Sequence, residues 1–161
     1  MTDPTSLELQ QRNALIETYA AGYSEVVAAL DGAGDVELDA CFPGEWSARQ
    51  VVHHLADSET TSYVRLRMLL AQEHAMIQAY DEEVFAMKLR YDRPIAASLA
   101  VLSAVRESST ELLRLLPEED WQRQGTHSES GSYTMRTWLE IYAAHAHDHA
   151  DQIRRARRGE K

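Results

Sequence analysis

The chain has 161 residues, of which 44% are hydrophobic, and it carries a formal net charge of −10. This length suffices for one hydrophobic core, so we expect a single domain over residues 1–161. An acidic surface repels phosphate groups, which argues against nucleic acid and anionic membranes as partners. No apolar run comes near the roughly 20 residues that span a bilayer. The N-terminus lacks a signal-peptide pattern and Cys41 is the only cysteine, so we expect a cytoplasmic protein.

Apolar residues at helical spacing predict four long helices, over residues 5–30, 48–72, 92–116 and 135–158. Thr5 or Ser6 can cap the first of them. Ser47, with Gln50 three residues later, predicts a capping box for the second, and Thr134 is the predicted cap of the fourth.

The connections between these helices carry weaker signals. Residues 35–46 are predicted to form a loop, and residues 122–133, which contain two glycines, a loop or a short hairpin. Residues 80–88 predict a short extra helix within the long crossover over residues 75–90. The predicted fold class is therefore all-α, a four-helix bundle with a short extra helix in its crossover.

Three histidines stand out on two of these helices. His145 and His149 are four residues apart, which stacks them on one helix face, and His54 lies on the inward face of an earlier helix. Three neutral imidazoles leave metal positions open for water or substrate, as in catalytic zinc sites. Three core histidines, each bonded to a neighbouring hydroxyl or carbonyl, remain the alternative. His53 is predicted to pack between helices and His147 to be exposed.

Polar neighbours of these histidines suggest supporting roles. Asp57 and Gln152 lie within a turn of His54 and His149, where either could accept the second ring proton of a metal ligand.

The small or polar residues Ser58, Ser62 and Tyr80 are candidates for lining a substrate pocket. Glu59 and Glu82 could act as acid–base groups near the crossover, but solvated charges are the preferred interpretation.

At this point the sequence resembles a known family. Residues 46–59, Trp-Ser-Ala-Arg-Gln-Val-Val-His-His-Leu-Ala-Asp-Ser-Glu, and residues 145–153, with the pattern His-x3-His-x2-Gln-Ile, are similar to the DinB-like superfamily. The most similar branch is that of the bacillithiol-transferase-like proteins, which are described as metal-dependent hydrolases. The chain departs from that branch at Asp148 and Gln152, where a histidine is usual, and near Phe85, where a tryptophan is usual.

The resemblance implies a divalent metal held by His54, His145 and His149 near one end of the bundle. It also implies a homodimer, and a reaction that transfers a low-molecular-weight thiol to an electrophilic small molecule. Three imidazoles suit zinc, nickel, copper and iron alike, and we expect zinc or nickel.

Three functional hypotheses follow from the residues and the resemblance. The first is a metal-dependent enzyme, either a thiol transferase or a hydrolase, acting on a small molecule. The second is a non-catalytic stress protein that binds a metal or a small ligand. In the third the histidines are structural and hold no metal.

Overall fold

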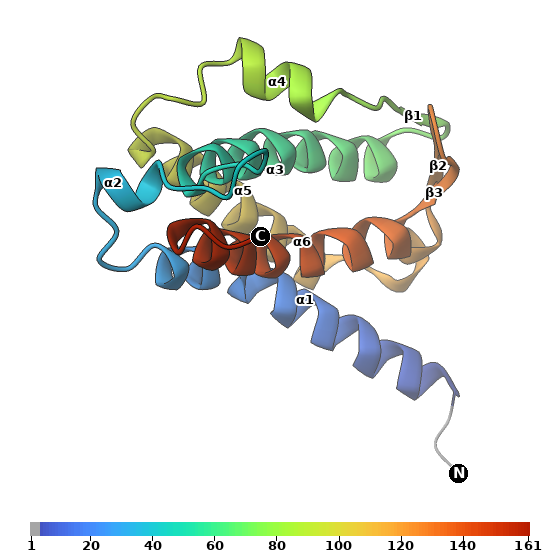
Figure 1. The fold of residues 1–161 in the computed structure, drawn as a ribbon. Coiled ribbons are helices and arrows are strands. Elements are labelled where there is room, and N and C mark those ends of the chain that lie inside the picture. The colour runs from blue at the N-terminus through green and yellow to red at the C-terminus, as the bar shows by residue number, and fades with distance from the viewer. Residues whose placement is uncertain (1–3) are drawn as a thin grey trace.

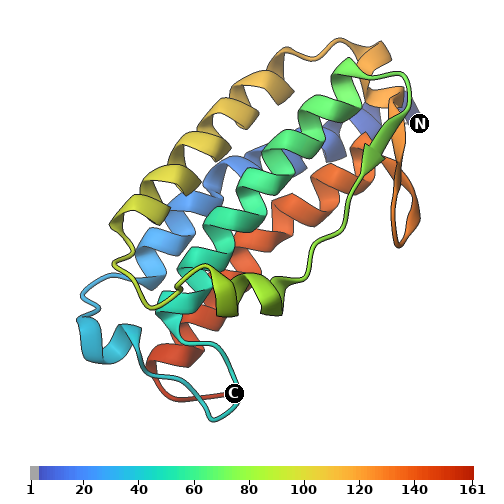
Figure 2. The same ribbon diagram turned by 90° about the horizontal axis from the view of Figure 1, so that it is seen from above.

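The computed structural model describes residues 4–161, which form a bundle of four long helices (Figure 1). These helices are α1 (Pro4–Ala29), α3 (Ala48–Ala71), α5 (Ala96–Leu115) and α6 (Met135–Arg157). Both α1 and α3 pack against α5 and α6. Helices α3 and α5 run in one direction, and α1 and α6 run in the other (Figure 2). The predicted all-α four-helix bundle is confirmed.

The connection from α3 to α5 returns along the length of the bundle, because these two helices are parallel (Figure 2). It contains strand β1 (Ala75–Ile77) and helix α4 (Glu82–Lys88). Asp81 caps α4, since its side chain accepts a 3.0 Å hydrogen bond from the Val84 N–H. The predicted extra helix is therefore present in the crossover.

A small sheet closes one end of the bundle. β2 (Gln124–His127) pairs antiparallel with β3 (Gly131–Thr134), as the predicted hairpin requires, and β1 pairs parallel with β2. Strand β1 was not predicted, because a three-residue strand whose partner lies about fifty residues away along the chain leaves no local pattern.

Two other connections contain short helices. The predicted loop over residues 35–46 begins with the four-residue helix α2 (Asp35–Leu38), and the 3-10 helix η1 (Glu118–Gln122) follows α5.

Two predicted helix caps are present. The Ser47 side chain accepts a hydrogen bond from the Gln50 N–H, and the Gln50 side chain accepts one from the Ser47 N–H, which completes the capping box of α3. Thr134 caps α6 by accepting a 3.0 Å hydrogen bond from the Thr137 N–H. The expectation for α1 was wrong: the helix begins at Pro4, so Thr5 and Ser6 lie inside it, and its cap position lies outside the described residues.

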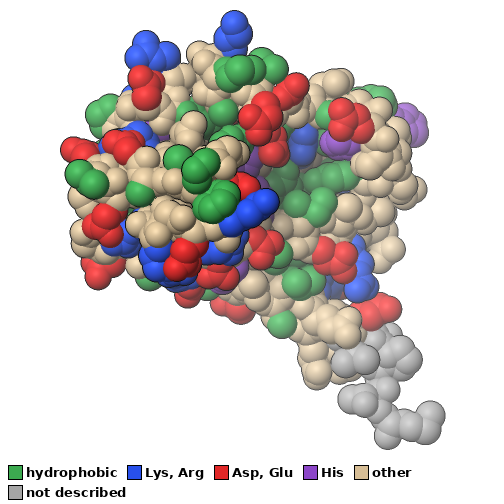
Figure 3. Space-filling view, in the orientation of Figure 1, with side chains coloured by type: hydrophobic (Ala, Val, Ile, Leu, Met, Phe, Trp, Pro, Cys, Tyr) green, Lys and Arg blue, Asp and Glu red, His purple; other side chains and the backbone are tan. Residues whose placement is uncertain are grey.

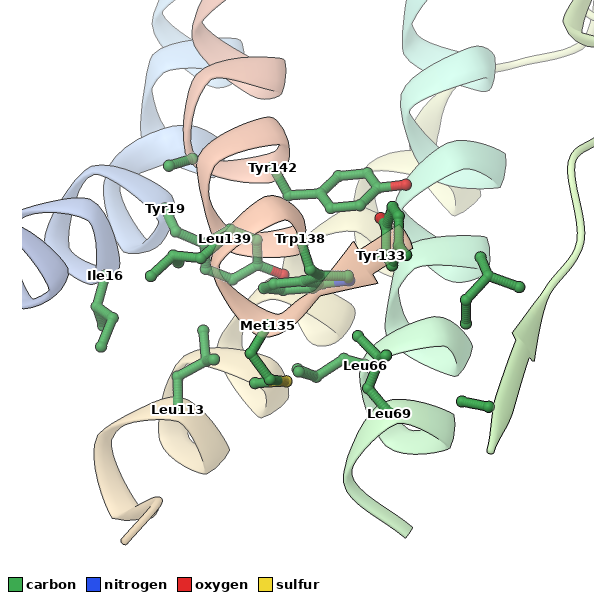
Figure 4. Close-up of a cluster of buried hydrophobic side chains, with 13 residues drawn as sticks. Ile16, Tyr19, Leu66, Leu69, Leu113, Tyr133, Met135, Trp138, Leu139 and Tyr142 are labelled. Atoms are coloured by element: carbon green, nitrogen blue, oxygen red, sulfur yellow. The ribbon is translucent and has the colours of Figure 1, made fainter. Parts of the chain in front are cut away.

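The core divides into two apolar clusters along the bundle. One lies at the sheet end and includes Leu66 and Trp138 (Figure 4). The other lies at the opposite end and includes Leu55 and Ile153. No described helix is both long enough and apolar enough to cross a bilayer. The face in Figure 3 carries acidic and basic side chains close together.

A buried ion pair separates the two clusters. Arg106 on α5 is 1% exposed and donates a 2.5 Å hydrogen bond to Glu59 on α3, which is fully buried. The Arg106 guanidinium also donates to the backbone carbonyls of Tyr19 on α1 and Tyr142 on α6. Gly22 makes room for it, because a Cβ there would lie 2.5 Å from Arg106 Nη2. This one side chain of α5 therefore contacts the three other long helices.

Replacing Arg106 with leucine should lower the free energy of unfolding by about 3–5 kcal/mol, because Glu59 is left as a buried charge without its partner. Urea denaturation of the metal-free protein measures this loss. Arg114→Leu is the matched control on the same helix. Its ion pair with Glu17 is solvent-exposed, so its loss should cost about 0–1 kcal/mol. Equal losses in the two variants would contradict a structural role for the buried pair.

Candidate metal centre

The three predicted histidines lie together between two neighbouring helices. His54 projects from α3, and His145 and His149 project from α6, which runs antiparallel to α3. One ring nitrogen from each lies within 4.8 Å of the other two. The ring centres of His54 and His149 are 4.7 Å apart, and those of His145 and His149 are 4.6 Å apart. Helical spacing and the antiparallel packing together produce this convergence.

Two of these rings are held by hydrogen bonds through Nδ1. His149 Nδ1–H donates to the side-chain oxygen of Gln152 at 2.7 Å. His145 Nδ1–H donates to Oε1 of Glu59 at 3.1 Å. An acceptor at Nδ1 keeps the proton on that nitrogen, so that Nε2 carries the free lone pair.

The site favours neutral imidazoles. Burial is the main cause that lowers the pKa of His54 to about 3, and the neighbouring His149 and His145 contribute to the shift. Burial and then His145 lower the pKa of His149 to about 4, although Gln152 opposes this shift. Near neutral pH both rings are therefore uncharged, which is the form that binds a metal.

Glu59 was predicted to be a solvated charge, and this was wrong. Its carboxylate is fully buried and accepts hydrogen bonds from both Arg106 and His145. The sequence does contain a signal for this pairing. Glu59 shares the inward face of its helix with Leu55 and Ser62, and Arg106 lies one turn after the buried Leu102. Opposite charges at inward positions of two helices indicate a buried pair.

Asp57 and Ser62 do not occupy their predicted places. Asp57 accepts a 2.6 Å hydrogen bond from the Tyr91 hydroxyl, because it lies on the side of α3 that faces the crossover. It therefore binds a crossover tyrosine rather than a histidine ring. The Ser62 hydroxyl is fully buried and donates to the Glu59 backbone carbonyl at 2.8 Å, so it is part of the core.

Ser58 and Tyr80 lie nearer the histidines. Ser58 Oγ is 3.5 Å from His145 Nε2. Burial raises the pKa of Tyr80 to about 12, and Ser58 is close enough to oppose this rise. A surface cleft of about 450 Å³ lies elsewhere, between α1, η1 and the start of α6, and contains none of the three histidines.

The other two histidines of these helices have separate partners. His53 is fully buried between helices, with Nδ1 2.8 Å from Ser98 Oγ and Nε2 2.9 Å from the Arg93 carbonyl oxygen, as its predicted packing role requires. His147 is only half-buried rather than fully exposed, and its Nε2–H donates to the Thr18 carbonyl on α1. Neither belongs to the three-histidine cluster.

The donor set fits a divalent cation. His54, His145 and His149 offer one ring nitrogen each, and two of the rings are oriented through their second nitrogen, as metal-binding histidines usually are. Three imidazoles suit zinc, nickel, copper and iron alike, and an ion held by them alone would keep positions open for water or another ligand.

Relatives of known sequence share most of the chain. The family model described as the DinB superfamily matches residues 18–153. A protein of Oceanobacillus iheyensis named "Putative metal-dependent hydrolase OB0782" is 38% identical over 118 residues, which cover 73% of this chain and 69% of that protein. "Putative metal-dependent hydrolase YfiT" of Bacillus subtilis is 31% identical over 151 residues, covering 92% of this chain and 85% of YfiT.

The fold agrees with these matches. The solved structure of YfiT, described as a probable metal-dependent hydrolase with an unusual four-helix bundle topology, superposes with a TM-score of 0.85 at 30% identity. The match covers 94% of this chain and 90% of that one. Helices α3 and α5 are parallel neighbours, which requires the long crossover between them. Sequence, fold and the grouped histidines thus agree, and the chain belongs to the DinB superfamily.

Proposed function

We propose that this protein binds one divalent metal ion through His54, His145 and His149 and uses it to transfer a low-molecular-weight thiol to an electrophilic small molecule. The observation that carries the proposal is the convergence of three imidazoles, with one ring nitrogen of each within 4.8 Å of the others. A divalent metal held there supplies a Lewis acid, which lowers the pKa of a bound thiol or water.

The residues of the chain prepare the site for an anionic partner. Three neutral ligands leave the charge of a divalent ion uncompensated, which favours a thiolate. The nearest buried carboxylate, Glu59, is already neutralised by Arg106, so it does not cancel that charge. Its role is to hold the proton on His145 Nδ1, as Gln152 does for His149.

The thiol must come from solution. The only protein thiol, Cys41, is exposed on the loop after α2, and the three-histidine cluster contains no cysteine. This supports a transferase that uses a thiol co-substrate rather than a protein nucleophile.

Hydrolysis is the second candidate, and the names of the relatives favour it. The same three histidines would serve it, with water in place of the thiol. The homodimer that the resemblance implies and the cytoplasmic location expected from the sequence stay predictions, as does the choice of zinc or nickel.

Replacing His54, His145 or His149 with alanine should abolish stoichiometric metal binding, because two imidazoles do not hold the ion at the affinity of three. Elemental analysis of protein purified without an affinity tag measures metal content. The matched control is His147→Ala, which lies between two of these histidines on α6 but bonds to α1. Full metal retention in any of the three variants would contradict the assignment.

The metal-free protein should lose stability as the pH falls below about 6.5, the ordinary histidine pKa that the unfolded chain retains. The folded protein keeps His54 and His149 neutral to about 3 and about 4, so only the unfolded state takes up protons in this range. Each of these two histidines should therefore lower the free energy of unfolding by about 2 kcal/mol between neutral pH and about pH 5.

Urea denaturation of the metal-free protein at the two pH values measures this loss. The double variant His54→Gln/His149→Gln should show a clearly smaller loss. An equal dependence on pH in both proteins would show that these histidines do not titrate as the structure requires.

The metal-loaded protein should conjugate a small thiol to monochlorobimane faster than the free thiol reacts. The panel includes bacillithiol, mycothiol, glutathione and cysteine, and fluorescence measures the product. The Cys41→Ser variant should keep the rate and His149→Ala should lose it. If no thiol is accelerated but metal-dependent cleavage of an ester such as nitrophenyl acetate is observed, the hydrolytic candidate replaces the transferase.

A further inference from the structure

Within residues 4–161, five buried side-chain polar atoms lack a hydrogen-bond partner, and three of them belong to Arg65, Tyr80 and Tyr133. Together with Tyr142 these residues form what we call the Arg65 cluster. Arg65 Nη1 donates to the Tyr142 hydroxyl at 3.1 Å, and its guanidinium carbon lies 6.0 Å from the centre of the Tyr80 ring. The hydroxyls of Tyr133 and Tyr142 point toward each other beside α3 (Figure 4). The unfilled donors therefore lie in one place.

The charge of Arg65 has no carboxylate partner among the described residues, whereas the buried Arg106 and Arg49 both form ion pairs. Its Nε–H is enclosed and donates to none of the described residues. Arg67, two residues further along the same helix, has no such unpaired nitrogen. Its guanidinium lies on the Tyr63 ring and donates to serine hydroxyls of α5, so none of its buried nitrogens is left without a partner.

The Arg65 cluster adjoins the three histidines. The ring of Tyr142 lies 5.6 Å from that of His145, with the planes nearly perpendicular. Ser58 also lies between the histidines and the Arg65 cluster, because its Oγ is 3.5 Å from His145 Nε2 and it is close to Tyr80. The helix α3 carries both Ser58 and Arg65, so Arg65 lies about two turns beyond Ser58 toward the sheet end.

We propose that the Arg65 cluster binds a carboxylate of the small-molecule substrate whose reactive group lies at the three histidines. The donors are the Arg65 Nε–H and the hydroxyls of Tyr80 and Tyr133, which suit the oxygens of one carboxylate. The inference rests on the proposed function, since it places a substrate at the histidines. It adds the substrate class: a thiol or an electrophile that carries a carboxylate.

Arg65 also has a structural role that must be separated from this one. Its Nη2 donates to the Gln78 carbonyl at 2.6 Å, which holds the crossover against α3. That contact and the bond to Tyr142 use the two terminal nitrogens and leave Nε free. Tyr133→Phe separates the two roles, because it removes a hydroxyl that makes no hydrogen bond among the described residues and keeps the buried ring.

The test compares two thiols that differ only in the charged group, mercaptopropionate and mercaptopropanol. Isothermal titration calorimetry measures the binding of each to the zinc-loaded protein and to Arg65→Gln, Tyr133→Phe and the control Arg67→Gln. We expect the wild-type protein to prefer the carboxylate by about tenfold or more, the range of a charge-assisted hydrogen bond. Arg65→Gln should abolish the preference, Tyr133→Phe should reduce it, and Arg67→Gln should keep it.

Affinity for mercaptopropanol should be the same in all four proteins, which shows that the metal site is intact. Equal affinity of the wild-type protein for the two thiols would overturn the carboxylate site and leave the proposed function standing.

A second titration uses metal-free protein with propionate, followed by NMR, and tests the Arg65 cluster alone. Propionate binding that is lost in Arg65→Gln supports the carboxylate site. If neither thiol binds the metal-loaded protein, this support still stands, but the proposed thiol chemistry is wrong. Absence of propionate binding, propionate binding that Arg65→Gln leaves unchanged, or tighter binding of inorganic phosphate than of propionate overturns the inference.

Discussion

The ion pair between Arg106 and Glu59 connects the stability of the bundle to the chemistry of its site. A single carboxylate oxygen accepts hydrogen bonds from the guanidinium of α5 and from the His145 ring of α6. The guanidinium also reaches α1 through the Tyr19 carbonyl. Burying both charges is costly, and the structure recovers this cost only because almost every donor is used. The same pair thus fixes the spacing of the four helices and the proton position on His145.

The chain topology determines which residues surround the histidines. Because α3 and α5 are parallel, the crossover must pass back along the bundle, and it carries Tyr80 to the face where α3 meets α6. The parallel pairing of β1 with β2 fixes the start of this crossover, and β3 brings Tyr133 to the same region. In an up-and-down bundle a short loop would replace the crossover, and this face would lack Tyr80.

Much of this fold follows from local sequence signals. Apolar periodicity identified the four helices, and the Ser47 capping box and the Thr134 cap fixed two of their starts, because these signals act within a few residues. The grouping of His54, His145 and His149 also follows from periodicity once two inward faces are assumed to meet.

The remaining features depend on partners distant in sequence. A lone glutamate on a helix is usually solvated, so Glu59 cannot be read as buried until Arg106 is placed opposite it. Asp57 faces Tyr91 because of where the crossover passes, which no local pattern specifies.

The three imidazoles also differ in the residues that contact them outside the cluster. His145 is backed by a carboxylate and His149 by a neutral amide oxygen, whereas the ring of His54 packs against Trp46 at 5.0 Å. A carboxylate that accepts from Nδ1 increases the electron density on the opposite nitrogen more than an amide oxygen does, and the Trp46 ring supplies no such acceptor. The donor strength of the set is therefore graded from α6 to α3, so an ion bound there would experience an asymmetric ligand field with its weakest donor on α3.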